Sequence, residues 1–219
     1  MVLLDDVQFP FGVSWLTRNR LKSDKGELWL RVPVWRKGRG KQAIRDVEIC
    51  YEEDWIKKHL RSIGEQYSNA PYKKDIIPEL VKIYESKPKF LVEFNIQIIR
   101  FLLELFGIPC KIILQSEVGV QGSATDLLVS LCNTIGATKY KTLVQVHKYH
   151  DETQFKNAGV RTEYIRFVPP KYPQLWGDFI ENLSGLDLYL NCGPRSFSIL
   201  QNAIRPECYA SEVSTESSD

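Results

Sequence analysis

The sequence has no long hydrophobic run. A helix that crosses a membrane needs about 20 consecutive apolar residues, and Glu93, Arg100 and Glu104 interrupt the most apolar region of the chain. The first residues, MVLLDDVQF, also lack the basic start and the cleavage site of a secretory signal. These absences predict a protein that is not inserted in a membrane and whose first residues already form a strand of the folded domain.

Cysteine is scarce, with five residues at wide spacings among 219. No CxxC pair occurs, and no histidine lies near a cysteine at metal-ligand spacing. Scattered cysteines in odd number do not form a disulfide framework, and a structural zinc site needs clustered ligands. The sequence therefore predicts a reducing, cytoplasmic environment and no metal site.

The signatures of several enzyme classes are also missing. The chain contains no GxxxxGK[ST] loop, and no GxGxxG follows a strand, so the common phosphate-binding loops are excluded. The GxSxG elbow and the HExxH motif are absent, and three histidines are too few for a histidine-rich metal site. Serine hydrolases and metalloproteases are thus excluded, and no cofactor is identified.

Positive charge is concentrated in one segment. Residues 17–45 hold ten Lys or Arg against two acids, with Trp15, Trp29 and Trp35 interleaved, whereas the remainder holds 19 against 25. Arginine binds phosphate or carboxylate through two parallel hydrogen bonds and tryptophan stacks on planar rings, so the segment predicts an anionic small-molecule partner. A solvated basic loop around residues 37–41 is the alternative. Nucleic acid is not expected, because the isoelectric point near 8.2 is low for a dedicated nucleic-acid-binding domain.

The hydrophobic pattern predicts an α/β fold with a small amino-terminal β region, central helices and then alternating β-α-β with a largely parallel sheet. Strands are expected over residues 2–5, 27–35, 43–51, 110–114, 138–146 and 162–168. Helices are expected over residues 54–68, 89–106, 123–135, 151–158, 177–182, 186–191 and 196–203. One domain is expected over 1–205, with candidate sub-domains 1–52 and 53–205, and the Ser/Thr/Glu-rich residues 206–219 are expected to form a disordered tail.

Acidic side chains that follow predicted strands are candidate catalytic groups. Asp5 and Asp6, with Gln8 close by, come directly after a short apolar strand, where ligands bind in α/β sheets. Such carboxylates coordinate metals, act as general bases or bind sugar hydroxyls, and they cap loops or helices equally well. Asp151 follows another predicted strand, where it could orient His147 or the adjacent histidine as a general base.

Further candidates come from the basic segment and the predicted helices. Arg18, Asn19 and Arg20 end an aromatic-rich stretch and are candidates for holding phosphate. His59 lies at the edge of the apolar stripe of its helix, where it is either a boundary histidine or an acid/base group. Asn95 falls on the buried face of the most apolar helix, so its amide either braces a neighbouring loop or contacts a ligand.

Short motifs follow one another along most of the chain in a characteristic order. They are LDDVQF from residue 4, RNR from residue 18, WLRVPV from residue 29, Lys58-His59, YSNAP from residue 67, and Asp187 followed by LNCG from residue 190. Their order and spacing together resemble the WbqC-like protein family. Members of this family are typically encoded with enzymes of O-antigen and other surface polysaccharide synthesis, which implies a role in making or modifying an activated sugar or glycan.

The resemblance implies a cytoplasmic transferase that acts on a nucleotide-linked sugar or with a carrier-linked acyl or aminoacyl donor. In this interpretation Arg18 and Arg20 hold phosphate, and the acid/base groups come from the residues named above. Lys58 and Asn191 belong to the matching motifs and join the expected substrate-binding set. A non-catalytic binding or scaffolding protein of the same pathway is the alternative.

Two features depart from the family pattern. Relatives usually carry a strand and loop of the type QPxYxPWxGYF before the segment that corresponds to residues 1–4, and this segment is not in the sequence. If that segment builds part of the site, this chain is expected to be truncated or inactive. Relatives also tend to carry glycines where this chain has residues 141–145, so a loop at the end of that strand is expected to differ.

Overall fold

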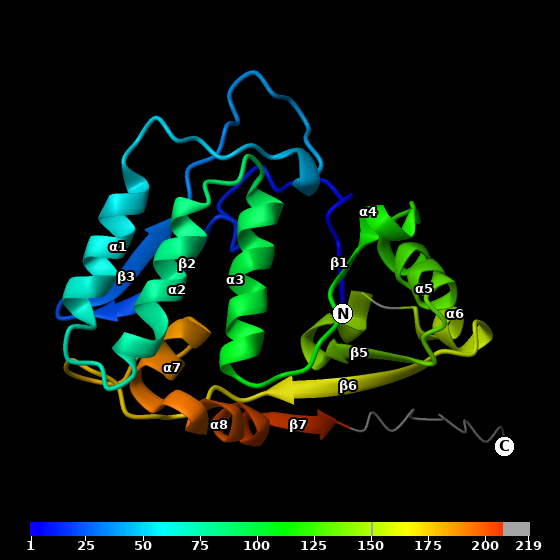
Figure 1. The fold of residues 1–219 in the computed structure, drawn as a ribbon. Helices are drawn as coiled ribbons and strands as arrows, with labels where there is room; N and C mark the ends of the chain where they lie inside the picture. Colours follow the sequence, from blue (N-terminus) through cyan, green and yellow to red (C-terminus); the bar gives the residue numbers. More distant parts are fainter. Residues whose placement is uncertain (150, 208–219) are drawn as a thin grey trace, which may run out of the picture. The chain divides into compact units, whose positions relative to one another are not determined.

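The computed structural model describes residues 1–149 and 151–207, and the chain divides into two compact units. Unit 1 comprises residues 1–119 and 169–202, and unit 2 comprises residues 120–168 and the chain from residue 203. The architecture is mixed α/β, as the sequence predicts, with parallel and antiparallel strand pairs (Figure 1). No helix among the described residues has the length and apolar character that crossing a membrane requires.

Unit 1 contains two pairs of strands. β1 (Val2–Leu3) runs parallel to β4 (Ile113–Leu114), and β2 (Arg18–Ser23) forms an antiparallel hairpin with β3 (Gly26–Arg31). Strand β2 was not among the predicted strands, because three of its six residues, RNRLKS, are basic. Leu21 is buried in the core, and the neighbouring Lys22 is buried as well, whereas Arg20 is only half-buried.

The strand predicted over residues 43–51 is wrong. This segment holds a short 3₁₀ turn, Ile44–Asp46, and then touches different neighbours through single bridges from Glu48 to Phe90 and from Ile49 to Val34. Its apolar side chains are buried, which explains the strand-like pattern. A continuous strand does not form because no single neighbour runs alongside the segment.

Helices build the rest of unit 1. They are α1 (Trp55–Gln66), α2 (Lys73–Glu85), α3 (Leu91–Leu105), the short α4 (Gln115–Val118), α7 (Gly185–Cys192) and α8 (Ser196–Ala203), which ends at the boundary of the unit. The predictions of α1, α3, α7 and α8 are confirmed. Helix α2 was not predicted; Pro78 lies inside it, although Ile76, Leu80 and Tyr84 are buried at helical spacing.

The core of unit 1 lies between the hairpin and these helices. Its fully buried side chains include Val47, Ile63, Tyr67, Ile76, Leu91 and Leu190. Gly193 follows α7 with a φ of +54°, and a Cβ at this position would overlap the ring of Tyr72. Only glycine therefore suits the end of the LNCG motif, for both conformational and steric reasons.

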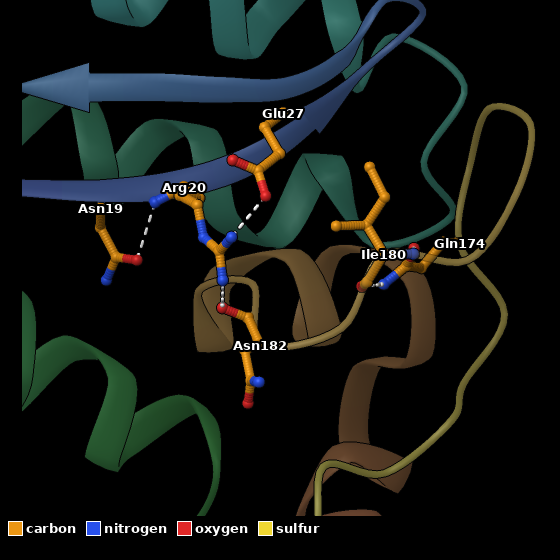
Figure 2. Close-up of polar contacts among 6 residues, drawn as sticks. All are labelled: Asn19, Arg20, Glu27, Gln174, Ile180 and Asn182. Atoms are coloured by element: carbon orange, nitrogen blue, oxygen red, sulfur yellow. Dashed lines mark hydrogen bonds and ion pairs between the residues drawn. The ribbon is translucent and has the colours of Figure 1, made fainter.

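A long irregular segment, residues 168–184, leads back into unit 1. The side-chain amide of Gln174 donates to the carbonyl of Ile180 at 2.8 Å and accepts from its N–H at 3.0 Å (Figure 2). The helix predicted over residues 177–182 is wrong, since Trp176 and Asn182 both have positive φ values, of 62° and 57°. The segment is thus an internally braced loop.

Unit 2 contains α5 (Ala124–Thr134), β5 (Lys139–Leu143), a 3₁₀ turn (Val144–Tyr149), α6 (Glu152–Asn157), β6 (Arg161–Phe167) and β7 (Ile204–Glu207). β5 and β6 pair in parallel, as the predicted β-α-β pattern requires, and β7 adds an antiparallel edge that was not predicted. β7 includes the first two positions of the segment expected to be a tail. Residues 208–219 of that segment lie outside the described residues.

Candidate functional site

A cavity of about 290 Å³ opens in unit 1. Its lining comes from the segment before β2, both strands of the hairpin, helices α1, α2 and α3, and the start of α7. Four of the predicted site residues line it, namely Arg18, Asn19, His59 and Asn95. The structure therefore brings together side chains that are separated by up to 77 positions in the sequence, and this cavity is the candidate functional site.

The opening of the cavity is marked by an aromatic and cationic cluster. Trp15 lines the cavity and is 61% exposed, and its ring stacks on that of Trp29 with 5.6 Å between centroids. The guanidinium carbon of Arg18 lies 4.2 Å from the centroid of the Trp29 ring and 6.0 Å from that of Trp15. These contacts are cation–π interactions, and they hold the Arg18 guanidinium over Trp29, a ring outside the lining, next to the exposed Trp15 of the cavity.

Arg18 and Arg20 differ in what they bind, although both project from β2. Arg20 forms an ion pair with Glu27 and donates a hydrogen bond to the carbonyl of Asn182 at 3.0 Å, so its charge is used within the fold (Figure 2). Arg18 has no acidic partner within the part of the chain that the structure describes. The Nε atoms of Arg18 and Arg20 are both buried without a hydrogen-bond partner there, so the difference between the two lies in the ion pair of Arg20. Because no acid neutralises its charge, Arg18 is the cation better suited to an incoming anion.

His59 is held in its neutral form. It is 7% exposed, and burial lowers its pKa to about 4. Its Nε2 accepts the backbone N–H of Arg31 at 3.2 Å, so the ring proton lies on Nδ1, which is 3.3 Å from the hydroxyl oxygen of Tyr84. Both ring nitrogens therefore have partners within the protein.

Asn95 braces the loop at the opening. Its amide nitrogen donates to the carbonyl of Leu16 at 2.9 Å, 79 positions away in the sequence. This is the bracing role that was one of the two expected alternatives. Because Leu16 follows Trp15 directly, the bond also helps to fix the aromatic side of the cavity.

The carboxylates near the amino terminus do not line the cavity. Asp5 is 2% exposed and accepts hydrogen bonds from both the N–H and the hydroxyl of Ser116. Asp6 pairs with Arg45 at 3.1 Å, and Gln8 forms a bridge with the segment before the 3₁₀ turn of unit 1. All three residues are engaged in joining the amino-terminal segment to its neighbours.

The remaining predicted residues lie apart from the cavity. Lys58 lines a separate basic hollow of about 660 Å³ in unit 1. Asn191 donates to the carbonyl of Asp187 at 2.7 Å and accepts from the N–H of Leu175 at 3.2 Å, so it ties the irregular segment to α7. Asp151 is in unit 2, where its side chain caps α6, and the histidine before it lies outside the described residues.

A buried polar network in unit 1 was missed as a candidate site. Asp187 is completely buried and accepts hydrogen bonds from the hydroxyls of Tyr67 and Tyr172. Burial raises its pKa, and the two hydroxyl donors and the nearby Lys22 act in the opposite direction. Lys22 is itself buried and donates to the carbonyl of Asp178. The only sequence signal was that Tyr67 and Asp187 belong to the matching motifs.

The described residues contain no group of three or more His, Cys, Asp or Glu side chains placed to hold a metal ion. Among the cysteines, Cys50, Cys110, Cys132 and Cys192 are free thiols. Burial raises the pKa of the Cys132 and Cys192 thiols, which disfavours the reactive thiolate. The site thus offers cationic and aromatic binding groups.

Comparison with known proteins agrees with the motifs in the sequence. The model of the WbqC-like protein family matches residues 1–199, which confirms the resemblance. The chain is also 31% identical over 194 residues to the uncharacterized protein Rv1507c of Mycobacterium tuberculosis, a match that covers 88% of this chain and 83% of that protein. No solved structure gives a significant match.

Proposed function

The chain belongs to the WbqC-like protein family, and we propose that it is a cytoplasmic transferase of surface polysaccharide or O-antigen biosynthesis. Its substrate in this proposal is an anionic nucleotide-linked sugar or a carrier-linked donor. The donor binds in unit 1, at the cavity that Arg18 and Trp15 border. Nucleic acid is not a partner in this proposal, and the free thiols support a reducing compartment.

The observation that carries the proposal is the state of Arg18. Its guanidinium is fixed over the Trp29 ring and, unlike that of Arg20, has no acidic partner among the described residues. A phosphate at this guanidinium would neutralise the charge. Asn19 is exposed on the cavity wall, and its side-chain oxygen accepts the backbone N–H of Arg20 at 2.8 Å, so its amide nitrogen is the group that can bind hydroxyl groups of a sugar.

A non-catalytic binding or scaffolding protein is the second candidate, and one observation favours it. The four predicted acid/base groups, Asp5, Asp6, His59 and Asp151, all make hydrogen bonds or ion pairs with other parts of the protein. Only His59 lines the cavity, and both of its ring nitrogens have partners. An enzyme needs a proton acceptor that is free to act.

The test is a thermal-shift screen of the protein against nucleotide sugars, nucleoside triphosphates and coenzyme A, with and without magnesium. A ligand at 100 times its Kd adds about 2.7 kcal/mol, which raises the Tm of a chain of this size by roughly 5–10 °C. Arg18→Ala should abolish the shift. Arg39→Ala removes an exposed arginine of the same basic segment and should leave the shift unchanged.

A ligand that binds then separates the two candidates. Incubation with the bound donor and a panel of glycan acceptors should release the nucleotide or the carrier if the protein is a transferase. Binding without release favours the scaffold. If no anionic ligand raises the Tm of a cooperatively melting protein, or if Arg18→Ala leaves the shift intact, the proposed site is wrong.

A further inference from the structure

We infer that the donor carries an aliphatic chain of about eight to ten carbons, which fills the cavity while its phosphate-bearing end pairs with Arg18. This inference rests on the proposed function, because it concerns the same site. It narrows the substrate class from any anionic donor to an amphipathic one. The size of the cavity, the pairing of its polar groups and the position of its positive charge support this inference.

Size gives the length of the chain. An apolar cavity of about 150 Å³ binds one molecule of benzene, which has six carbons. The cavity of about 290 Å³ is about twice that size and therefore holds a chain of about ten carbons. This is at the lower end of the range for small-molecule sites, so a whole nucleotide sugar does not fit inside.

The walls favour hydrocarbon over a nucleobase. Most of the lining is aliphatic or aromatic, including Leu21, Leu30, Ile98, Phe101, Leu102 and Leu186. A nucleobase has several donors and acceptors on its edges, and each one buried without a partner weakens binding. An aliphatic chain has none.

The polar groups in the lining are already paired within the protein. The Thr17 hydroxyl donates to the carbonyl of Ser14 at 3.2 Å, and the Ser184 hydroxyl accepts from the N–H of Leu186 at 3.3 Å. His59 and Asn95 bind main-chain atoms, as described above. The guanidinium of Arg18 and the side-chain amide nitrogen of Asn19 remain available to a ligand, whereas the side-chain oxygen of Asn19 accepts the N–H of Arg20.

The position of the charge sets the orientation of the ligand. Trp15 is the exposed part of the lining, and Arg18 lies over the Trp15–Trp29 pair. The anion therefore binds at the surface and the chain points inward. This arrangement matches a molecule with one apolar end and one phosphate-bearing end.

The test is a series of n-alkyl phosphates from two to fourteen carbons, with Kd measured by isothermal titration calorimetry on the full chain. Affinity should rise about fourfold for each methylene buried and should level off at about eight to ten carbons. Arg18→Ala should weaken all chain lengths by a similar factor. A flat dependence on chain length would overturn the inference.

Variants of the wall test where the chain lies. Ile98→Trp should move the plateau to shorter chains and leave the Kd of ethyl phosphate unchanged. Leu102→Phe is a smaller change that tests the same wall if the first variant does not fold. Ile135→Trp adds the same bulk at an exposed position in unit 2 and serves as the matched control. A plateau that neither wall variant moves would contradict the proposed location.

Two sources of such a chain can be told apart. Octanoyl-coenzyme A represents an acyl thioester carried by a phosphopantetheine group, and geranyl diphosphate represents an isoprenoid carrier. The source is the one that binds more tightly than the alkyl phosphate of equal length. Weaker binding of both would argue against an amphipathic donor.

The failure of the inference and the failure of the proposed function give different results. If nucleotide sugars bind through Arg18 but alkyl phosphates show no dependence on length, the inference is wrong and the proposed function stands. If alkyl phosphates show the plateau but no nucleotide sugar or carrier-linked donor binds, the cavity is assigned correctly and the proposed function is wrong.

Discussion

The neutral, buried state of His59 predicts that unit 1 loses stability in mild acid. Its pKa falls from an ordinary value of 6.5 to about 4 in the folded protein because the ring is buried. The unfolded chain therefore takes up a proton at a higher pH than the folded protein does. The stabilisation is complete above pH 6.5 and is lost as the pH falls from there towards 4.

The size of the effect follows from these two pKa values. Between pH 7 and pH 5 the free energy of unfolding should fall by about 2 kcal/mol through His59 alone. With a urea m-value of about 2 kcal/mol/M, the midpoint of unfolding should move by about 1 M. The contribution of His59 is therefore measured as a difference: the change in midpoint between pH 7 and pH 5 in the wild type minus the same change in a variant without a titrating side chain at this position.

Tryptophan fluorescence is the appropriate assay, because all five tryptophans of the chain lie in unit 1. Urea unfolding is followed at pH 7 and pH 5 for the wild type and for His59→Gln. Glutamine can still accept the N–H of Arg31 but does not titrate, so its midpoint should depend on pH less steeply. His147→Gln, in unit 2, should leave the fluorescence transition unchanged at both pH values. If wild type and His59→Gln show equal pH dependence, His59 is not buried as described.

Three further changes test the structure around the site. Gly193→Ala should lower Tm strongly in differential scanning calorimetry, since its Cβ would overlap a tyrosine ring, whereas Gly38→Ala, which also has positive φ but open space, should cost only about 1 kcal/mol. Tyr67→Phe should lower the free energy of urea unfolding by about 1–3 kcal/mol, because it leaves the buried Asp187 short of a donor; an unchanged value would contradict the network. Asn95→Ala frees the loop at the opening and should weaken binding of the anionic donor several-fold in titration calorimetry without removing Arg18; unchanged affinity would mean that the loop needs no brace.

Helical periodicity predicted much of the fold. α1, α3 and α5 show apolar side chains at steps of three and four, and these helices form close to the expected ends. Helix α2 was not predicted, because a proline interrupts its otherwise regular pattern of apolar residues. Strand β2 was not predicted, because basic side chains are not typical of strands. In the structure the Trp29 ring of the neighbouring strand holds one of these side chains, Arg18, in place.

The candidate site was predicted in part, for a physical reason. Arg18 was found because charge density and interleaved tryptophans are visible in the sequence. The Asp187 network could not be found in this way, because its bond to Tyr67 joins residues 120 positions apart. Asp5 was expected at a ligand site, but its carboxylate is satisfied by Ser116, 111 positions away. Sequence proximity does not reveal such partners.

Unit 1 is built from two separate stretches of sequence, so its core cannot be completed during synthesis until the second stretch has been made. Leu186 and Leu190 of α7 belong to the same core as the side chains of residues 1–119. About 70 residues must be synthesised between the end of the first stretch and the arrival of α7, which takes roughly 4–14 s at 5–20 residues per second. During this interval the apolar side chains of α1, α2 and α3 lack the contacts that Leu186 and Leu190 later supply, so the core of unit 1 is completed only when the second stretch has been synthesised.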